Sequence, residues 1–421
     1  MSTPTTSLVW KTPAVSSPAK PSVERLNALE RRLFNITIQN DPGTKRSYTV
    51  SREPGFMDQL HFFYHSTDEK QVGAQIVRSH IVPKLENPKT YLSIGAGEGV
   101  FSSNTLEAEQ FKEAILVDRN PEALKILEKY FSLKFKNKKP KFLHNFAQAI
   151  KIANGYAPCK PHLKFQLAHA EFPYGVTASE SEVKSVLTSN YELGWLNRKR
   201  TPLPDSISII GDDNAPYTLR ISDNGLAAYK SYDFPQADLV CLDHMLYFHP
   251  PEHWVDIATQ AYQLVKPGGA MVILVHGDAL FNEPNEVANI INALGGQNDD
   301  INGFAQKLQT ALPDARFDYL AVKTRHWAAS EKSMYELLKF FAYDTGAVLG
   351  ANAMSFIMAN SLRVSDYEVK DGKTAAAYEC VKADKFIVAY KAAPESPYNG
   401  IIPLYPSYGD GLYPFYYARK E

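Results

Sequence analysis

The sequence predicts an α/β protein built on a mostly parallel sheet, and two patterns carry this prediction. Between residues 90 and 278, short apolar runs alternate with stretches whose apolar residues recur three and four positions apart. Strands that alternate with helices form βαβ units, which pair in parallel with right-handed crossovers. The second pattern is the glycine-rich turn in "YLSIGAGEGVFS" (91–102), placed where a first strand passes into a helix.

The further elements follow from the same periodicities. "ERLNALERRLF" (24–34) is helical in spacing, and a second helix is expected over 68–82, closed by Pro83. Strands are then expected at 90–97, 113–120, 237–248 and 270–278, alternating with helices at 104–113, 121–131 and 252–265. After residue 278 the chain is expected to be helical to about 360, before an antiparallel strand pair at 374–381 and 385–390 completes the sheet.

Composition divides the chain into parts. Residues 1–22 are rich in Ser, Thr and Pro and contain no acid, which predicts a disordered leader; an organellar presequence is disfavoured because arginine is absent before Arg25. Residues 23–89 are expected to form a helical cap that contributes to the substrate site. Residues 90–390 form the main domain, with a polar rim insertion at about 174–236 that contains a short strand at "ISIIGDD", and 391–421 form a Pro/Tyr-rich tail.

Charge and cysteine content limit the classes of function. The formal net charge of −1 argues against non-specific binding of nucleic acid or an anionic membrane, and no 18-residue apolar run predicts a membrane span. Cysteines are odd in number and far apart, which predicts reduced, buried thiols and a cytoplasmic protein; they are Cys159, Cys241 and Cys380. His249 and His253 flank two prolines that disfavour a shared helical face, so no metal is expected.

The glycine turn and a distant acid predict a nucleotide-like ligand. Gly95 and Gly97 allow a tight turn that brings backbone close to a ligand, and Asp118 ends the next strand, where a carboxylate can bind a ribose diol. A dinucleotide is the alternative, but Gly99 stands one position early for that fingerprint. The acid Glu98 would repel a pyrophosphate and suits the cationic end of S-adenosylmethionine.

Two later segments resemble class I S-adenosylmethionine-dependent methyltransferases. "LVKPGGAMVILV" (264–275) resembles the helix end, glycine turn and strand of that family, and "ADLVCLDHMLYF" (237–248) resembles the preceding strand, whose end, at Asp243, faces the methyl donor. The resemblance covers 90–278 in family order. It implies a Rossmann-like, seven-stranded sheet with an antiparallel C-terminal strand, S-adenosylmethionine as cofactor and S-adenosylhomocysteine as product.

A closer resemblance points to the histamine N-methyltransferase group. Four segments between about 60 and 390 resemble motifs of that group: "FFYHSTDEKQ" (62–71), "KFQLAHAEF" (164–172), "MLYF" (245–248) and "KFIVAY" (385–390). It implies that Asp68 binds the substrate amine, while His244 and Lys382 replace amides of the substrate site. A substrate with both an amine and an acidic group would fit Asp68 and Lys382.

The resemblance also implies a set of cofactor-binding positions: Gly95, Ala96, Gly97, Glu98, Asp118, Arg119, His169, Ala170, Glu171 and Asp243. His169–Glu171 would lie near the adenine. "IIGDDNAPY", with Asp212 after an apolar run, is the rival segment for that contact.

Methyl transfer needs an unprotonated acceptor and precise alignment rather than a metal. Asp68 or His244 could take the proton of the amine, and three aromatic side chains could line the site: Tyr64, Tyr247 and Phe248. Each of these residues also has a purely structural interpretation. Asp68 could cap a helix, and the histidine and the aromatic residues could belong to the core. Lys382 could be a solvated lysine.

The function predicted is N-methylation of a small amine. The alternatives are a protein or peptide methyltransferase and an S-adenosylmethionine-binding scaffold without turnover. An enclosed site would favour the first and an open groove the second. The sequence leaves the oligomeric state open.

Overall fold

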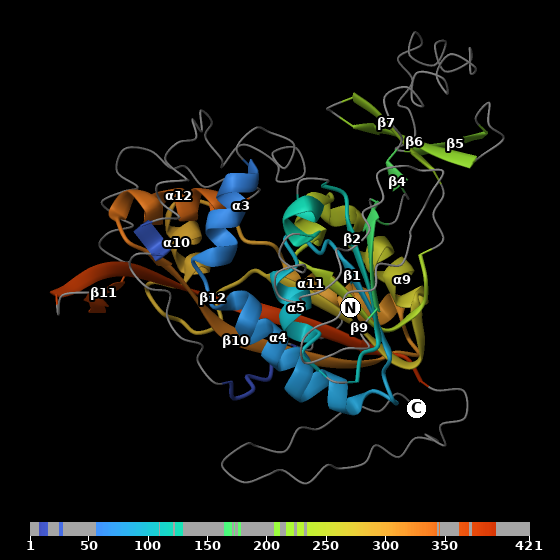
Figure 1. Cartoon of the computed structure of the whole chain (residues 1–421), viewed down its shortest axis with the longest axis horizontal. Coiled ribbons are helices and arrows are strands. Elements are labelled where there is room, and N and C mark those ends of the chain that lie inside the picture. The colour runs from blue at the N-terminus through green and yellow to red at the C-terminus, as the bar shows by residue number, and fades with distance from the viewer. Residues whose placement is uncertain are drawn as a thin grey trace, which may run out of the picture.

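A computed structural model describes residues 8–15, 25–27, 56–108, 110–120, 123–128, 164–170, 172, 176–177, 206–210, 216–222, 225–230, 234–342, 345, 362–369 and 373–392. Figure 1 shows a twisted central sheet with helices on both faces and a small second sheet that projects beyond its edge. The expected tail beyond 392 and Cys159 lie outside the described residues. Cys241 and Cys380 are free and buried, as predicted.

The main sheet has the predicted mostly parallel arrangement. Its strand order is β10-β12-β9-β8-β1-β2-β3, with β11 paired to β12 as an eighth strand. The five parallel strands are β1 (Thr90–Ile94), β2 (Glu113–Asp118), β3 (Lys164–His169), β8 (Ala237–Asp243) and β9 (Val265–His276). β12 (Lys373–Tyr390) runs antiparallel to β9 and to β10 (Arg316–Ala328), and β11 spans Leu362–Val369. The parallel strands are apolar on both faces because helices cover both faces.

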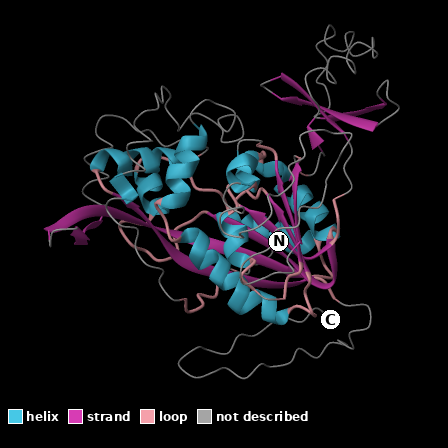
Figure 2. Cartoon of the chain, in the orientation of Figure 1, coloured by secondary structure: helices cyan, strands magenta, loops and turns pink. Residues whose placement is uncertain are grey.

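Two hydrophobic cores lie on the two faces of this sheet. On one face, α4 (Glu69–Ile76) and α5 (Val100–Thr105) pack over alternate residues of the strands, continued by a π-turn at Val77–Ile81 and a 3-10 turn at Val82–Lys84. On the other, α9 (Trp254–Gln263) and α11 (Ile301–Ala311) cover the intervening residues. Residues 123–128 are also helical. The sheet is therefore held between two helical layers (Figure 2).

A third helical group stands beside one end of the sheet. It consists of α3 (Phe56–His65), α10 (Val287–Ala293) and α12 (Glu331–Ala342), which share a core that includes Phe63 and Phe341. Figure 1 shows these helices next to the β12 and β10 end of the sheet. Part of the expected cap thus packs against helices from the C-terminal half of the chain.

The C-terminal half departs from the prediction. The region expected to be helical to about 360 contains β10, and the two short strands expected at 374–381 and 385–390 are one continuous strand, β12, whose antiparallel partner is β10. "RFDYLAVKTRHWA" alternates only loosely, and its polar residues Thr324 and His326 are fully buried. Burial of these groups in a polar cluster, described below, hides the strand periodicity. The helix expected at 104–113 occupies Val100–Thr105 instead.

The rim insertion contains more structure than the single strand expected there. β4 (Val176–Thr177), β5 (Ser206–Ile210), β6 (Pro216–Ser222) and β7 (Gly225–Lys230) form an antiparallel sheet in the order β4-β7-β6-β5. Residues 217–222 of β6 pair with residues 225–230 of β7. Asp212 lies outside the described residues.

Part of the expected leader is ordered against β10, which corrects the prediction of disorder for residues 8–15. Lys11 pairs in parallel with Leu320, its N–H donating to the Tyr319 carbonyl over 2.9 Å. Trp10 Nε1 donates to Asn302 Oδ1 over 2.8 Å, and its ring meets Tyr319 edge-on. Apolar and β-bridge contacts offset the entropic cost of ordering this segment. Among the described residues, no helix is both long and apolar enough to cross a membrane.

Candidate active site

The glycine turn is a close-packed loop at the carboxyl end of β1. Gly95, Gly97 and Gly99 have φ values of +76°, +54° and +76°, which side-chain-bearing residues rarely adopt. A Cβ on Gly95 would stand 2.5 Å from Met245 Cβ, and one on Gly97 would stand 3.0 Å from the Tyr64 hydroxyl. The turn therefore needs glycine for both its conformation and its neighbours.

Asp118 ends β2 beside this turn, as predicted. Its Oδ2 accepts the Gly97 N–H over 2.7 Å, and its Oδ1 accepts the Asn120 N–H over 2.7 Å. A carboxylate has about four lone-pair acceptor sites, and the hydroxyl groups of a diol are donors of the kind it binds. The adjacent Arg119 guanidinium lies over the Phe248 ring, 5.0 Å from its centroid. Asp118, the acid expected to bind a ribose, therefore lies near Phe248, which lines the pocket described below.

Glu98 is not directed at the ligand side of the turn. Its carboxylate is only 1% exposed and lies 2.9 Å from His61 Nδ1 and 3.1 Å from His65 Nε2, both on α3. Burial raises its pKa, but the bonds from the two histidines prevail and lower it to about 2. The expected contact with a cationic ligand is thus replaced by contacts to the cap helix. Helix α3 folds back over the turn, which sequence spacing alone does not show.

His169 and Ala170 lie at the end of β3, next to Asp118. The Ala170 N–H donates to the Asp118 carbonyl over 3.1 Å, and His169 pairs with Asp118 in the β2–β3 register. Glu171 lies outside the described residues. The predicted adenine segment and the predicted ribose acid therefore share one sheet edge.

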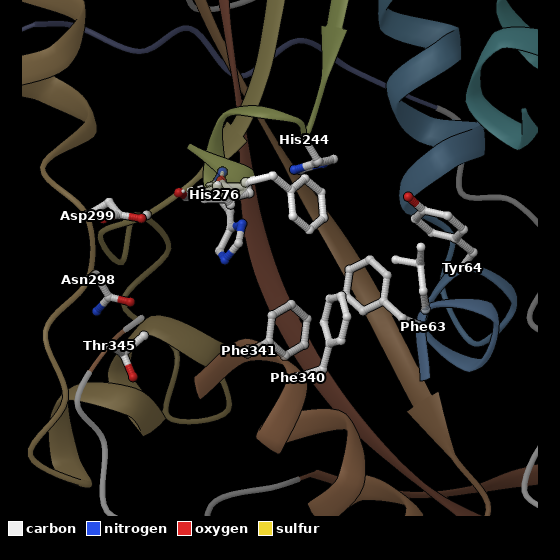
Figure 3. A pocket seen from close by; sticks show the side chains of 13 residues that line it. Phe63, Tyr64, His244, His276, Asn298, Asp299, Phe340, Phe341 and Thr345 are labelled. Atoms are coloured by element: carbon white, nitrogen blue, oxygen red, sulfur yellow. Dashed lines mark hydrogen bonds between the residues drawn. The ribbon is translucent and has the colours of Figure 1, made fainter. Parts of the chain in front are cut away.

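A pocket with about 780 Å³ of free space, including its mouth, opens beside the carboxyl ends of β8 and β9. Its walls are mainly aromatic: Phe63, Tyr64, Tyr247, Phe248, Phe340 and Phe341. Polar groups come from His244, His276, Asn298 and Asp299. Figure 3 shows His244 and His276 at the top of the cavity, Phe63, Phe340 and Phe341 below them, Asp299 on the side of His276, and Tyr64 on the far side. Four predicted site residues, Tyr64, His244, Tyr247 and Phe248, therefore line one pocket.

His244 connects this pocket to a buried polar cluster. Its Nε2 lies 3.0 Å from Glu69 Oε1 and 3.6 Å from Asp384 Oδ1. Its backbone φ is +50°, an uncommon conformation for a residue with a Cβ. Burial and the Glu69 carboxylate raise the pKa of Asp384, although Lys382 and His244 act in the opposite direction. Lys382, Lys70 and His244 together hold the pKa of Glu69 well below its usual value despite burial.

Asp68, which was predicted to bind the substrate amine, does not line the pocket. Its Oδ1 accepts the Arg325 N–H of β10 over 2.7 Å, and it is 2% exposed. Its side chain makes no capping bond to α4, so the helix-cap reading is also wrong. Burial raises its pKa to about 7, although the Arg325 N–H and guanidinium oppose this. Glu69, the next residue, is the acid that lies beside His244.

Lys382 is also absent from the pocket lining. Its Nζ donates to Glu69 and lies 2.9 Å from Asp384 Oδ1, with the Phe63 ring 5.3 Å away. Its ammonium charge is therefore neutralised inside the protein. Neither Asp68 nor Lys382, which were expected to bind a substrate with an amine and an acid, lines this pocket.

Asp243, at the end of β8, is paired with Lys70. The Lys70 Nζ donates to Asp243 Oδ1 over 2.9 Å, lies 2.9 Å from Glu69 Oε1, and stands 4.8 Å from the centre of the Tyr64 ring. Lys70 was not predicted as a site residue, although it lies in the quoted "HSTDEK" segment. The direction in which each residue of this segment points is set by α4.

His276 is the main pocket residue that the sequence did not indicate. It ends β9, and burial together with the nearby Lys382 lowers its pKa well below the usual value. Its Nδ1 has no hydrogen-bond partner among the described residues. An uncharged imidazole nitrogen is thus available to a ligand. Phe340 and Phe341 were also missed, because their helix reads as an ordinary amphipathic helix.

The residues at the turn fit S-adenosylmethionine. The glycines leave no room for a Cβ and allow the backbone to come close to a ligand, and the Asp118 carboxylate stands at the strand end where a ribose diol would bind. Tyr64 contacts the turn and also lines the pocket, so the pocket adjoins the turn. The donor set suits a nucleoside with a diol, and the adjoining cavity suits an acceptor molecule.

The sequence model of a methyltransferase-domain family matches residues 68–341. Among curated protein sequences, none matches the chain. The YcgJ protein of Bacillus subtilis has 12% identity and a TM-score of 0.34, covering 77% of this chain and 99% of its own. The plantazolicin methyltransferase BpumL, in complex with SAH, has 8% identity and a TM-score of 0.37, covering 86% and 100%. Human N-acetylserotonin methyltransferase, in complex with SAM, has 11% identity and a TM-score of 0.29, covering 88% and 66%.

Proposed function

The chain belongs to the methyltransferase-domain family and is an S-adenosylmethionine-dependent methyltransferase, and on this premise we propose that it methylates the nitrogen of a small amine. We also propose that it falls within a group similar to histamine N-methyltransferase. The observation that carries the proposal is the aromatic pocket beside the glycine turn, with the His244 imidazole in its wall and the Glu69 carboxylate behind it.

His244 is the proposed general base. The acceptor amine must lose its proton, and an imidazole is suited to take it near neutral pH. Glu69, 3.0 Å from His244 Nε2, orients the ring and stabilises the imidazolium that forms. Asp384, 3.6 Å from the same nitrogen and with a raised pKa, can share the proton. The uncommon φ of His244 fixes its ring between the pocket and these carboxylates.

The pocket wall suits a cationic or aromatic amine. The faces of Phe63, Phe340 and Phe341 exclude water and attract positive charge. His276 Nδ1 offers one neutral hydrogen-bonding position, and the Asp299 carboxylate also lines the cavity, on the side of His276 (Figure 3). A small ligand with one amine and one further polar group could contact both.

S-adenosylmethionine, when bound, supplies an electrophilic methyl group. The chain's own residues contribute alignment: the Asp118 carboxylate and the glycine turn hold the nucleoside end, and Tyr64 separates this turn from the pocket. Alignment of this kind can contribute on the order of 7–11 kcal/mol to rate acceleration.

A polypeptide substrate needs an open groove, whereas this pocket lies between α3, α12 and the ends of β8 and β9. This enclosure favours a small acceptor over a protein or peptide. A scaffold without turnover would have no need for a base in the pocket wall.

The test is a methyl-transfer assay with methyl-labelled S-adenosylmethionine, small primary and secondary amines, and a peptide panel. Label is expected in the amines, and it should be lost in His244→Ala but kept in His253→Ala, which changes a histidine outside the pocket. Label in peptides alone would support the protein methyltransferase. Tight cofactor binding without transfer to any acceptor would support the scaffold.

A further inference from the structure

Two histidines of α3 and the acid of the glycine turn form a compact three-residue cluster. His61 and His65 are four residues apart, so both side chains emerge from one face of the helix. His61 Nδ1 lies 2.9 and 3.0 Å from the two oxygens of Glu98, and His65 Nε2 lies 3.1 Å from Glu98 Oε2. One donor atom from each of the three residues lies within 4.8 Å of the others.

Glu98 is a buried carboxylate without a fixed countercharge. Among the described residues it ion-pairs only with the two histidines, and no lysine or arginine contacts it. A buried carboxylate is costly unless it is paired or coordinates a metal. A divalent cation bound by Glu98 and the two imidazole nitrogens would supply the missing fixed positive charge.

The donor set is that of a transition-metal site. Two imidazole nitrogens and one carboxylate oxygen bind Zn²⁺ at roughly 2.0–2.2 Å, which places tetrahedral donors roughly 3.3 Å apart. The distances from Glu98 to the two imidazole nitrogens, 2.9–3.1 Å, are close to that value, and all three donors lie within 4.8 Å, so small side-chain shifts would admit the ion. Three protein ligands leave a fourth position open, as in zinc sites that keep a water or a further ligand.

We propose that His61, His65 and Glu98 bind a divalent transition-metal ion, with Zn²⁺ the best match. The ion clamps α3 to the cofactor turn. The same helix carries Leu60, Phe63 and Tyr64, which line the pocket, so the clamp holds the pocket wall against the turn.

Arg25 distinguishes the metal site from a simple hydrogen-bonded cluster. Its Nη2 lies 3.1 Å from His65 Nδ1 and can only donate, so His65 Nε2 carries the proton in this state. When His65 Nε2 binds a metal, its proton resides on Nδ1 and opposes Arg25. Arg25 is exposed, and replacing it with Gln, which can accept from Nδ1, should tighten metal binding.

The full chain would be stripped with a chelator and titrated with Zn²⁺ by calorimetry, with bound metal counted by elemental analysis. One equivalent per chain is expected. His61→Ala, His65→Ala and Glu98→Gln should each weaken binding at least about 100-fold, His253→Ala should not, and Arg25→Gln should strengthen it. Zinc should raise the Tm of the unmodified chain and leave the Tm of the histidine variants unchanged.

X-ray absorption on the zinc-loaded full chain provides a readout that does not depend on the folding of variants. Scattering from two imidazoles with nitrogen or oxygen ligands at roughly 2.0–2.2 Å is expected. Zinc without imidazole scattering, binding of several weak equivalents, or one equivalent that survives the double change His61→Ala with His65→Ala would overturn the site.

Discussion

His244 Nε2 lies 3.0 Å from Glu69 Oε1, joining a residue at the end of β8 to the first residue of α4. The pair stands at the boundary between the aromatic pocket and a buried cluster that also contains Lys70, Lys382 and Asp384. Glu69 is completely buried, whereas His244 faces the cavity (Figure 3). A proton accepted by His244 in the pocket would therefore interact directly with the buried charges of this cluster.

Replacing His244 by Ala is expected to lower kcat by about 10²–10⁴-fold, because general-base assistance contributes that much. Affinity for S-adenosylmethionine should change little, since the glycine turn and Asp118 are untouched. Steady-state kinetics and calorimetry measure the two effects. A kcat equal to that of His253→Ala would remove His244 from the mechanism.

Lys382→Met should destabilise the fold by about 3–5 kcal/mol. The change leaves the buried Glu69 and Asp384 carboxylates without the ammonium that neutralises them. Urea unfolding measures the loss, with the exposed Lys332→Met as the matched control. If stability were unchanged and only KM rose, Lys382 would contact substrate after all.

Asp68→Asn should remove a pH dependence of stability. Because the folded pKa of about 7 exceeds the ordinary pKa of 3.8, the native state binds more protons than the unfolded state between these values. Stability therefore falls as pH rises through that window, by roughly 2–3 kcal/mol between pH 5 and pH 8. Unfolding curves across this range should be flatter for the variant, whose amide oxygen can still accept from Arg325. Identical slopes for the two proteins would contradict the raised pKa.

Asp118→Asn should weaken S-adenosylmethionine binding by about 10-fold or more, because a charged acceptor for hydrogen bonds is lost. The exposed Asp256→Asn on α9 is the control. Calorimetric titration gives both dissociation constants. Equal affinity in the two variants would place the nucleoside away from the end of β2.

Trp10→Ala should destabilise the protein by about 1–3 kcal/mol, since it removes an edge-on contact with Tyr319 and the bond to Asn302. Val9, which is 57% exposed, provides a control in Val9→Ala. The denaturant midpoints of the two variants, each relative to the unmodified protein, measure the effect. A midpoint unchanged by Trp10→Ala would return residues 8–15 to the disordered leader expected from composition.

Much of the parallel half of the sheet was predictable because its signals are local. The strand at Thr90–Ile94, the glycine turn and Asp118 follow one another within about thirty residues, and each is marked by apolar periodicity or by residue type. β10 was missed because its buried polar residues, Thr324 and His326, satisfy Asp384 and lie near Glu69. These partners are distant in sequence, so nothing local signals that the strand is buried.

The candidate site shows the same division. Tyr64, His244, Tyr247 and Phe248 were predicted and line the pocket, whereas Asp68, Lys382 and Glu98 carry charges that the fold directs elsewhere. The sequence by itself determined the order of strands and helices in the parallel half of the sheet, the conformation of the glycine turn and the residue types near it, because backbone preferences and periodicity act over a few residues. Only the tertiary structure decided that Glu69 rather than Asp68 supports His244, and that Glu98 meets His61 and His65. The role of a carboxylate depends on the direction of its side chain and on the partners that other elements bring to it. Neighbouring residues such as Asp68 and Glu69 point in different directions and therefore meet different partners.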